Sequence, residues 1–210
     1  MNKIKEIECY LDELFPDPKC ELEYSKDYEL LIATMLSAQT TDKRVNQVTK
    51  ILFQKYSSLE ALKEAPIESI RAIIKPLGTY QRKSEYVKEI ATILVDQYNA
   101  KTPSDRKILE SLPGVGHKTA NVFLSNIYDI PAIAVDTHVE RVSKRLGLAK
   151  QEDSVLQVEK KLEKKYAKKV WGKRHHQMVL FGRYHCKSMK PNCANCKLKD
   201  ICQYYKFSKK

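Results

Sequence analysis

Four cysteines near the C-terminal end constrain this chain more than any other feature of its sequence. Cys186, Cys193, Cys196 and Cys202 follow the spacing C-x6-C-x2-C-x5-C, so one short segment supplies four thiols. Four thiols grouped in this way indicate a metal centre. A structural zinc site usually draws on two short pairs of cysteines, and only Cys193 and Cys196 are close enough to form one. An iron–sulfur cluster is wider and suits the longer arms on both sides better.

The alternatives to a cluster are a zinc ion, two disulfides or four unrelated thiols. Disulfides need an oxidising compartment, and residues 1–6 lack the apolar core of a signal peptide. No apolar run approaches the length of a membrane span. We therefore expect a soluble, intracellular protein that holds an iron–sulfur cluster. Cys9 and Cys20 lie far from the four cysteines in sequence, and we expect them to be ordinary thiols.

The charge of the chain is distributed unevenly. The net charge is +12, but residues 1–139 hold 18 Lys and Arg against 20 Asp and Glu, whereas residues 140–210 hold 20 against 6. A basic part joined to a near-neutral part is typical of a protein that binds a polyanion, most simply nucleic acid. The alternative is a solvated, lysine-rich helix, and the lysines between Lys160 and Lys169 partly fit it.

The spacing of apolar residues predicts an all-α protein. It predicts helices over 4–14, 28–37, 43–56, 67–74, 82–98, 107–112, 119–127, 138–146, 154–166 and 174–184. Residues 30–36 are apolar on most sides, so we expect that helix to be buried centrally. Thr137 followed by Glu140 fits a capping box, Gly147 is placed to end the helix before it, and Pro66 is placed at a helix start.

A glycine-containing turn separates two of these helices. Leu112-Pro113-Gly114-Val115-Gly116 allows a sharp turn and a close approach to a partner, because glycine adopts conformations that other residues avoid. The start of the following helix offers backbone N–H groups and the positive end of the helix dipole, which suits a phosphate. A plain joint between two helices, without a ligand, is the alternative.

Lys118 and Asp136 are the candidate catalytic residues. Lys118 follows the turn directly, where the helix dipole and partial burial would both disfavour an ammonium group. A neutral amine is the nucleophile that Schiff-base chemistry requires, although a contact with phosphate explains a lysine there equally well. Asp136 can cap a helix, and its carboxylate can also assist proton transfer or stabilise a positive charge.

Taken together, these motifs resemble those of the endonuclease III family. The features are residues 112–121 (LPGVGHKTAN), residues 135–139 (VDTHV) and the four-cysteine segment, in this order. Residues 36–42 (LSAQTTD) and Gly182-Arg183-Tyr184 extend the similarity over nearly the whole chain. The family comprises bifunctional DNA glycosylases of the helix-hairpin-helix superfamily, whose members act in base excision repair.

The resemblance implies a two-domain fold. A six-helix barrel domain would span residues 20–130, with the helix-hairpin-helix motif near 107–127. Residues 1–19 together with 131–210 would form a domain that holds a [4Fe–4S] cluster on the four cysteines. The resemblance also implies a monomeric bacterial protein of the cytoplasm, associated with the nucleoid, whose partner is duplex DNA containing a damaged pyrimidine or an abasic site.

The chemistry implied by the resemblance begins with an oxidised or ring-saturated pyrimidine, such as thymine glycol, flipped out of the duplex. Lys118 would attack C1′ of the sugar with the support of Asp136, the base would leave, and the Schiff base would permit β-elimination. The strand would thus be cut 3′ to the lesion. The implied DNA contacts are Gln39, Thr79, Leu112, Gly114, Gly116, His117, His138, Lys187 and Lys190.

The chain departs from the family pattern at three positions. Thr79 stands where the family often has an apolar wedge that enters the base stack. His117 replaces a common arginine, and Phe181 replaces a common histidine. These changes bear on strand insertion, lesion preference and affinity.

Two other functions are compatible with part of the sequence. An adenine-specific mismatch glycosylase shares the hairpin, the aspartate and the cysteines, but it does not normally have lysine at position 118 and usually has a further C-terminal domain. A non-catalytic DNA-binding module has no need for both Lys118 and Asp136.

Overall fold

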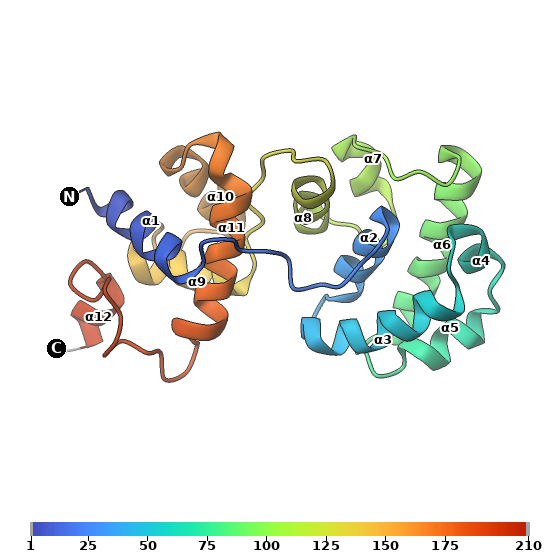
Figure 1. Cartoon of the computed structure of the whole chain (residues 1–210), viewed down its shortest axis with the longest axis horizontal. Helices are drawn as coiled ribbons and strands as arrows, with labels where there is room; N and C mark the ends of the chain where they lie inside the picture. The colour runs from blue at the N-terminus through green and yellow to red at the C-terminus, as the bar shows by residue number, and fades with distance from the viewer. Residues whose placement is uncertain (1, 209–210) are drawn as a thin grey trace. The chain divides into compact units, whose positions relative to one another are not determined.

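The computed structural model describes residues 2–208, and none of these residues forms a β-strand. The helices pack into two compact units, each with its own hydrophobic core (Figure 1). One unit is Cys20–Tyr128, and the other combines Met1–Lys19 with Asp129–Lys210. Among the described residues, no helix is both long and apolar enough to cross a lipid bilayer. The prediction of an all-α fold is confirmed.

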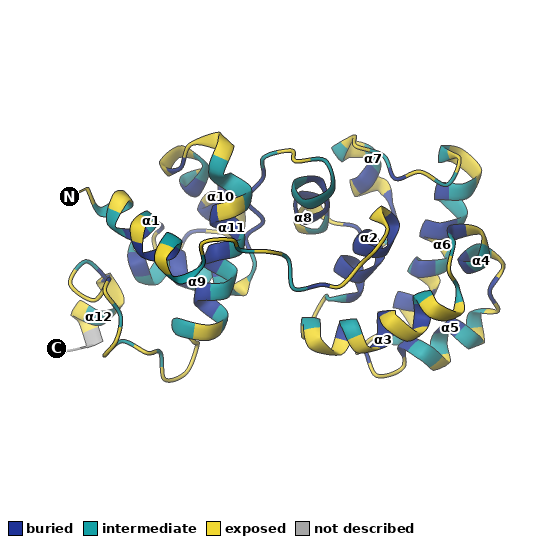
Figure 2. Ribbon diagram, viewed as in Figure 1, coloured by how far each residue is buried: buried dark blue, intermediate teal, exposed yellow. Residues whose placement is uncertain are grey.

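The unit Cys20–Tyr128 is built around one fully buried helix. Its described helices are α2 (Asp27–Leu36), α3 (Asp42–Lys55), α4 (Leu59–Glu64), α5 (Ile67–Ile74), α6 (Tyr80–Tyr98), α7 (Arg106–Ser111) and α8 (His117–Ile127). Helix α2 packs against α3, α6 and α8, and every residue from Tyr28 to Leu36 is buried (Figure 2). The expectation that the apolar run 30–36 forms a central helix is therefore confirmed.

The second unit is organised around α9. Its described helices are α1 (Lys3–Leu14), α9 (Thr137–Leu146), α10 (Val155–Lys165), the 3-10 helix η1 (Lys168–Val170), α11 (Trp171–Leu180), the π-helical turn η2 (Phe181–His185) and α12 (Gln203–Ser208). Helix α9 packs against α10, α11, η2 and α12. The N-terminal helix joins this unit because α1 packs along α11 (Figure 1).

A buried ion pair fixes α1 to α11. Arg174 is 6 % exposed and donates hydrogen bonds of 2.8 and 3.1 Å to the two carboxylate oxygens of Asp12. These bonds hold the pKa of the Asp12 carboxyl far below its usual range. A two-pronged contact of this kind is geometrically specific, so it sets the register between the first helix of the chain and one near its end.

The ends of the helices differ from the sequence-based expectations in a few places. The expected capping box of Thr137 and Glu140 is wrong, because α9 is capped one residue earlier: Asp136 Oδ1 accepts hydrogen bonds from the backbone N–H groups of His138 and Val139. Gly147 ends α9 as predicted, with φ +70°. Pro66 precedes α5 as its N-cap residue. The short helices α4 and α12 were not expected.

Candidate active site and nucleic-acid interface

Helices α7 and α8 form a hairpin that is closed by Leu112. The backbone N–H of Val115 donates to the carbonyl of Leu112 at 3.1 Å. The side chain of Leu112 lies in the core, since the residue is only 3 % exposed. Leu112 can therefore meet a partner only through its backbone.

The two glycines of the hairpin differ in their backbone angles and in the space around them. Gly114 has φ +73°, and a Cβ there would lie 2.5 Å from Cδ2 of Tyr86 and 3.1 Å from Cγ of Met35. Gly116 has ordinary backbone angles, and a Cβ there would meet no atom within 4 Å. Packing within the protein thus explains Gly114, whereas the surface at Gly116 is open to an external partner.

The start of α8 has the properties of an anion site. Gly116 is its N-cap residue, no side chain caps the helix, and its first turn contains no acidic residue. The positive end of the helix dipole is therefore not neutralised from within the helix. Such a helix start, reached through a glycine, is suited to the phosphate of a nucleic acid.

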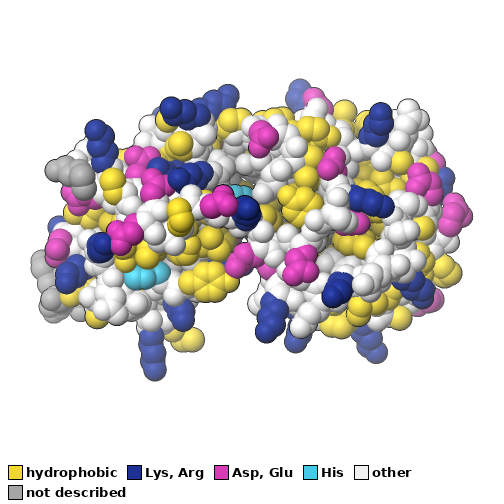
Figure 3. All heavy atoms as spheres, in the orientation of Figure 1, with side chains coloured by type: hydrophobic (Ala, Val, Ile, Leu, Met, Phe, Trp, Pro, Cys, Tyr) yellow, Lys and Arg dark blue, Asp and Glu magenta, His cyan; other side chains and the backbone are white. Residues whose placement is uncertain are grey.

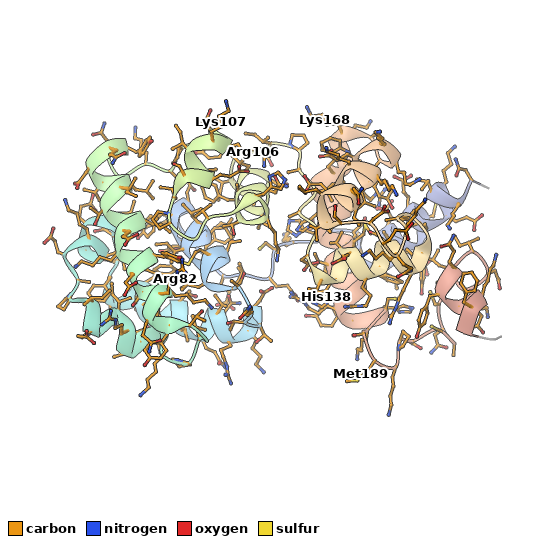
Figure 4. The ribbon with its side chains drawn as sticks, turned by 180° about the vertical axis from the view of Figure 1, so that it is seen from behind. Arg82, Arg106, Lys107, His138, Lys168 and Met189 are labelled. Carbon is orange, nitrogen blue, oxygen red and sulfur yellow. The ribbon has the colours of Figure 1, made fainter. Side chains whose placement is uncertain are left out.

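His117 lies across the hairpin. Its Nδ1 is 3.0 Å from Oε1 of Glu110 on α7, and its Nε2 is 3.3 Å from Nδ2 of Asn121 one turn further along α8. Arg106, on α7, donates to Oδ1 of the same Asn121 (Figure 4). The imidazole that replaces the expected arginine is thus part of a polar network that joins α7 to α8.

Lys118 is exposed in the first turn of α8. The partial burial that we expected is absent from the described structure. Its ammonium group makes no hydrogen bond or ion pair with any other residue of the range 2–208. Lys118 follows the hairpin turn in the sequence and has no carboxylate partner among the described residues, so its amine is available to react.

The two carboxylate oxygens of Asp136 differ in their hydrogen bonds. Oδ1 accepts both capping bonds, at 2.9 Å from His138 N and 2.7 Å from Val139 N. Oδ2 takes no part in the cap, and the residue is half-buried. One oxygen thus fixes the carboxylate at the start of α9, and the other is available to accept a proton or to stabilise a positive charge. Lys118 lies in the unit Cys20–Tyr128 and Asp136 in the other unit.

His138, beside Asp136, is held as a neutral imidazole (Figure 4). Burial lowers the pKa of His138, although the nearby carboxylate of Asp136 opposes this shift. Nη2 of Arg141 is 3.2 Å from Nδ1 of His138. Because a guanidinium can only donate, Nδ1 accepts, and the proton of the neutral ring is on Nε2.

The four cysteines at the C-terminal end line a single cavity. All four are free thiols, so the disulfide alternative is wrong. Leu146, Phe181 and Tyr205 line the same cavity. Between residues 2 and 208, no group of three or more His, Cys, Asp or Glu side chains is arranged to hold a single metal ion. Thiols that surround a cavity without converging on one point suit a multi-iron cluster better than a tetrahedral zinc ion.

The thiols need a positive partner to ionise. Burial raises the pKa of Cys196 to about 11, and burial together with the neighbouring thiols raises the pKa of Cys193. Metal ligation requires thiolates, so binding of iron would release protons here. Arg145 adds positive charge, since its Nη1 lies 3.5 Å from Sγ of Cys186. The donor set and its mostly apolar surroundings therefore fit an iron–sulfur cluster.

The same arginine shapes the loop that follows Cys186. Arg145 donates to the carbonyls of Lys187 and Ser188 at 2.6 and 2.9 Å. Lys187 and Lys190 are exposed, and Met189 projects from the loop with 84 % exposure (Figure 4). Phe181, in contrast, is 1 % exposed and stacks on His185, so its side chain belongs to the core beside the cavity.

Gln39 and Thr79 occupy two exposed turns of the unit Cys20–Tyr128. Both have positive φ values, +57° for Gln39 and +56° for Thr79. Left-handed conformations are unfavourable for residues other than glycine, so these turns persist only if other contacts hold them. Lys83, whose side chain holds the Gln39 turn, was missed by the sequence analysis, as were Arg141 and Arg145.

The surface charge does not by itself locate an interface. On the face drawn in Figure 3, Lys and Arg side chains are interspersed with Asp and Glu side chains. The net charge of +12 is therefore not gathered into one patch on that face. The hairpin, with its uncapped helix start, is a more specific indication of where a nucleic acid binds.

The sequence of the chain is similar to those of known DNA repair proteins. A family model described as HhH-GPD superfamily base excision DNA repair protein matches residues 32–168. Endonuclease III of Bacillus subtilis (strain 168) is 48 % identical over 97 % of this chain and 94 % of that protein. Endonuclease III of Escherichia coli (strain K12) is 43 % identical over 97 % of each.

Solved structures show the same similarity. A trapped endonuclease III–DNA covalent intermediate, an estranged-adenine complex, superposes with a TM-score of 0.94, 46 % identity and full coverage of both chains. A non-covalent endonuclease III–DNA complex also has a TM-score of 0.94, with 100 % of this chain and 99 % of that chain covered. A thermostable thymine-DNA glycosylase is 23 % identical with a TM-score of 0.86 over 98 % and 97 %, which is a similarity of fold.

The two hairpin glycines predict a contrast between two substitutions. Gly114→Ala should lower the free energy of unfolding by about 1–3 kcal/mol, because it forces an unfavourable φ and an overlap with the Tyr86 ring. Gly116→Ala should cost less, about 0.5–1 kcal/mol, because alanine is a poorer N-cap than glycine but overlaps no neighbouring atom. Urea denaturation of the three proteins measures both effects, and equal losses in the two variants would contradict this account of the turn.

Proposed function

The chain belongs to the endonuclease III family of HhH-GPD base excision DNA repair proteins, and from this we propose that it is a DNA glycosylase with AP lyase activity. It removes oxidised or ring-saturated pyrimidines, such as thymine glycol, from duplex DNA and cuts the strand 3′ to the abasic site. The observation that carries the proposal is the exposed amine of Lys118, without an ion-pair partner among residues 2–208, directly behind an uncapped helix start. The covalent DNA intermediate of a relative with 46 % identity supports it.

We assign DNA binding mainly to the hairpin of α7 and α8. The backbone at Gly114 and Gly116 and the start of α8 hold a phosphate, and Leu112 contributes its backbone only. The exposed lysines of the cysteine loop, Lys187 and Lys190, add contacts to the DNA backbone elsewhere. None of these contacts reads the sequence, which suits an enzyme that searches any duplex for damage.

Access to the sugar requires the damaged base to leave the stack. Base flipping has an energetic cost, which is smallest at damaged or mispaired positions. Gln39 and Thr79 occupy exposed turns of one unit and are assigned to the gap that the flipped base leaves. Thr79 is small and polar, so Gln39 has the longer reach of the two side chains. His117 is assigned to the DNA backbone beside the hairpin.

The reaction proper is nucleophilic. The neutral amine of Lys118 attacks C1′, the glycosidic bond breaks, and the base departs with the bonding electrons and takes up a proton. The attacking nitrogen loses one proton, O4′ takes up a proton as the C1′–O4′ bond breaks, and a protonated Schiff base joins Lys118 to C1′. Removal of a proton from C2′ then expels the 3′ phosphate by β-elimination, and water hydrolyses the Schiff base.

Asp136 supports the first step. Its Oδ2 is not used by the helix cap, so this oxygen stabilises the positive charge that develops on the sugar or accepts a proton from the amine. His138 contributes a neutral ring to the same site.

We assign a [4Fe–4S] cluster to Cys186, Cys193, Cys196 and Cys202. When bound, the cluster would tie together the four cysteines of residues 186–202 and so shape the loop that carries Lys187 and Lys190. Arg145 holds that loop from the side of α9. The cluster domain in this proposal comprises residues 1–19 with 131–210, and the barrel domain comprises residues 20–130 with the hairpin near 107–127.

The proposal also places the protein in its cellular setting. The relatives at 43 and 48 % identity are bacterial, which supports a bacterial enzyme. We assign it to duplex DNA of the nucleoid, on which it acts as a monomer. An adenine-specific mismatch glycosylase is less well supported, because Lys118 would have no role in it.

Substitution of Lys118 tests the mechanism. On a duplex with one thymine glycol, Lys118→Gln should lower strand cleavage by about three orders of magnitude or more and abolish the adduct that borohydride traps, because the Schiff base cannot form. Lys107→Gln, on the exposed side of α7, is the matched control, since it removes the same charge from the same hairpin (Figure 4). Cleavage that survives intact in Lys118→Gln would rule out this nucleophile.

Asp136→Asn separates capping from chemistry. Asparagine caps helices as well as aspartate, so stability should change little, whereas removal of thymine glycol should slow about 100-fold or more. Cleavage of a preformed abasic site should fall less, because no glycosidic bond needs to break. Asp105→Asn is the control, since Asp105 caps α7 in the same way. Equal effects of the two substitutions on base removal would contradict the role of Asp136.

Metal analysis tests the cysteine assignment. The purified protein should contain about four iron and four acid-labile sulfide per chain, as the cluster requires. Cys196→Ser should lose both, and Cys9→Ser, whose thiol is exposed away from the cavity, should retain both. One zinc ion per chain in place of iron would contradict the assignment.

A further inference from the structure

Lys83 is a lysine on the core-facing side of its helix. It is 4 % exposed and lies on the same stripe of α6 as Val87, Ile90 and Leu94, all of which are buried. A buried ammonium group is costly unless its N–H groups are bonded. Burial lowers the pKa of Lys83, and no carboxylate offsets that effect. The position therefore needs an explanation other than a surface charge.

The ammonium group of Lys83 is bonded entirely to the turn that carries Gln39. Nζ lies 2.9 Å from the carbonyl oxygen of Leu36, 2.8 Å from that of Ala38 and 3.4 Å from Oγ1 of Thr40. Leu36 is the last residue of α2, where the negative end of the helix dipole faces the cation. The bonded residues thus lie both before and after Gln39 in the sequence.

The helix that carries Lys83 begins at the second turn, and an ordinary helical backbone bond, which any non-proline residue at position 83 would make, joins the two. The N–H of Lys83 donates to the carbonyl oxygen of Thr79 at 3.1 Å. Thr79 and Gln39 both have left-handed backbone angles, although neither is glycine. The side chain of Lys83 thus joins the Gln39 turn to the helix that begins at the Thr79 turn. Arg82, the preceding residue, is labelled in Figure 4. All of these groups lie within the unit Cys20–Tyr128.

We propose that Lys83 is a positioning residue for strand insertion, which holds the Gln39 turn at a fixed distance from the Thr79 turn so that both tips enter the duplex together. This inference rests on the proposed function, because it assumes that the two tips fill the gap left by a flipped base. Lys83 does not contact the sugar or the base. It acts through Gln39 and leaves the chemistry at Lys118 unchanged.

The test compares two substrates that differ in their need for insertion. Lys83→Met should slow removal of thymine glycol from duplex DNA by about 10- to 100-fold, because a misplaced tip no longer stabilises the flipped state. Cleavage of an abasic site in single-stranded DNA, which has no stack to fill, should stay within about 3-fold of the wild type. Lys88→Met is the control: Lys88 also lies on α6 and donates to a carbonyl, that of Ala65, remote from both turns.

A double-mutant cycle with Gln39→Ala distinguishes positioning from general stability. If Lys83 acts through Gln39, the duplex rate of Gln39→Ala/Lys83→Met should match that of the slower single variant, because coupled residues are not additive. Multiplied effects of the two substitutions, or a Lys83→Met duplex rate equal to that of the wild type, would overturn the inference. A wild type without lyase activity on either substrate would instead refute the proposed function.

Loss of folding in Lys83→Met would not leave the inference untested. In that case Thr40→Val, which removes one acceptor of the Lys83 ammonium, takes its place in the same cycle with Gln39→Ala. Coupling between Thr40→Val and Gln39→Ala on duplex DNA supports the inference, and additivity contradicts it.

Discussion

The left-handed turn at Gly114 is the constraint on which the active site depends. Its φ of +73° and its contact with Tyr86 leave no room for a side chain, so the turn is fixed against α6. The chain then enters α8 through Gly116, with no side chain to cap the helix. Lys118 is consequently presented in the first turn of a helix whose positive end is open. In the function that we propose, phosphate binding and nucleophile placement thus have one structural cause.

The other candidate functional groups have a second property in common. Each is fixed in the fold by some of its atoms, and its remaining atoms are available to a ligand. Asp136 uses one oxygen to cap α9 and keeps the other free of the cap. The thiols line a cavity where burial raises the pKa of Cys193 and Cys196, so they need a positive partner before they ionise. Gln39 is held through the carbonyls around it, and its side chain remains exposed.

The sequence predicted the parts that local patterns encode. Apolar spacing located the longer helices, and the continuous run 30–36 identified the buried helix, because burial on all sides needs apolar residues all round. It missed α4 and α12, which have six residues each, although it located α7, which is equally short. It offered both Thr137 and Asp136 as caps, and only Asp136 makes the capping hydrogen bonds of α9. Lys83 was missed because its partners are carbonyls more than 40 residues away, which no local pattern records. The one available signal was a lysine on an apolar stripe.

The most direct test of the central claim is to locate the covalent bond itself. The wild-type protein would be trapped with borohydride on a thymine glycol duplex, digested with nuclease and protease, and mapped by tandem mass spectrometry. The account predicts one modified peptide, from the start of α8, with the sugar remnant on Lys118. A remnant on any other amine would contradict the claim that the hairpin delivers the nucleophile.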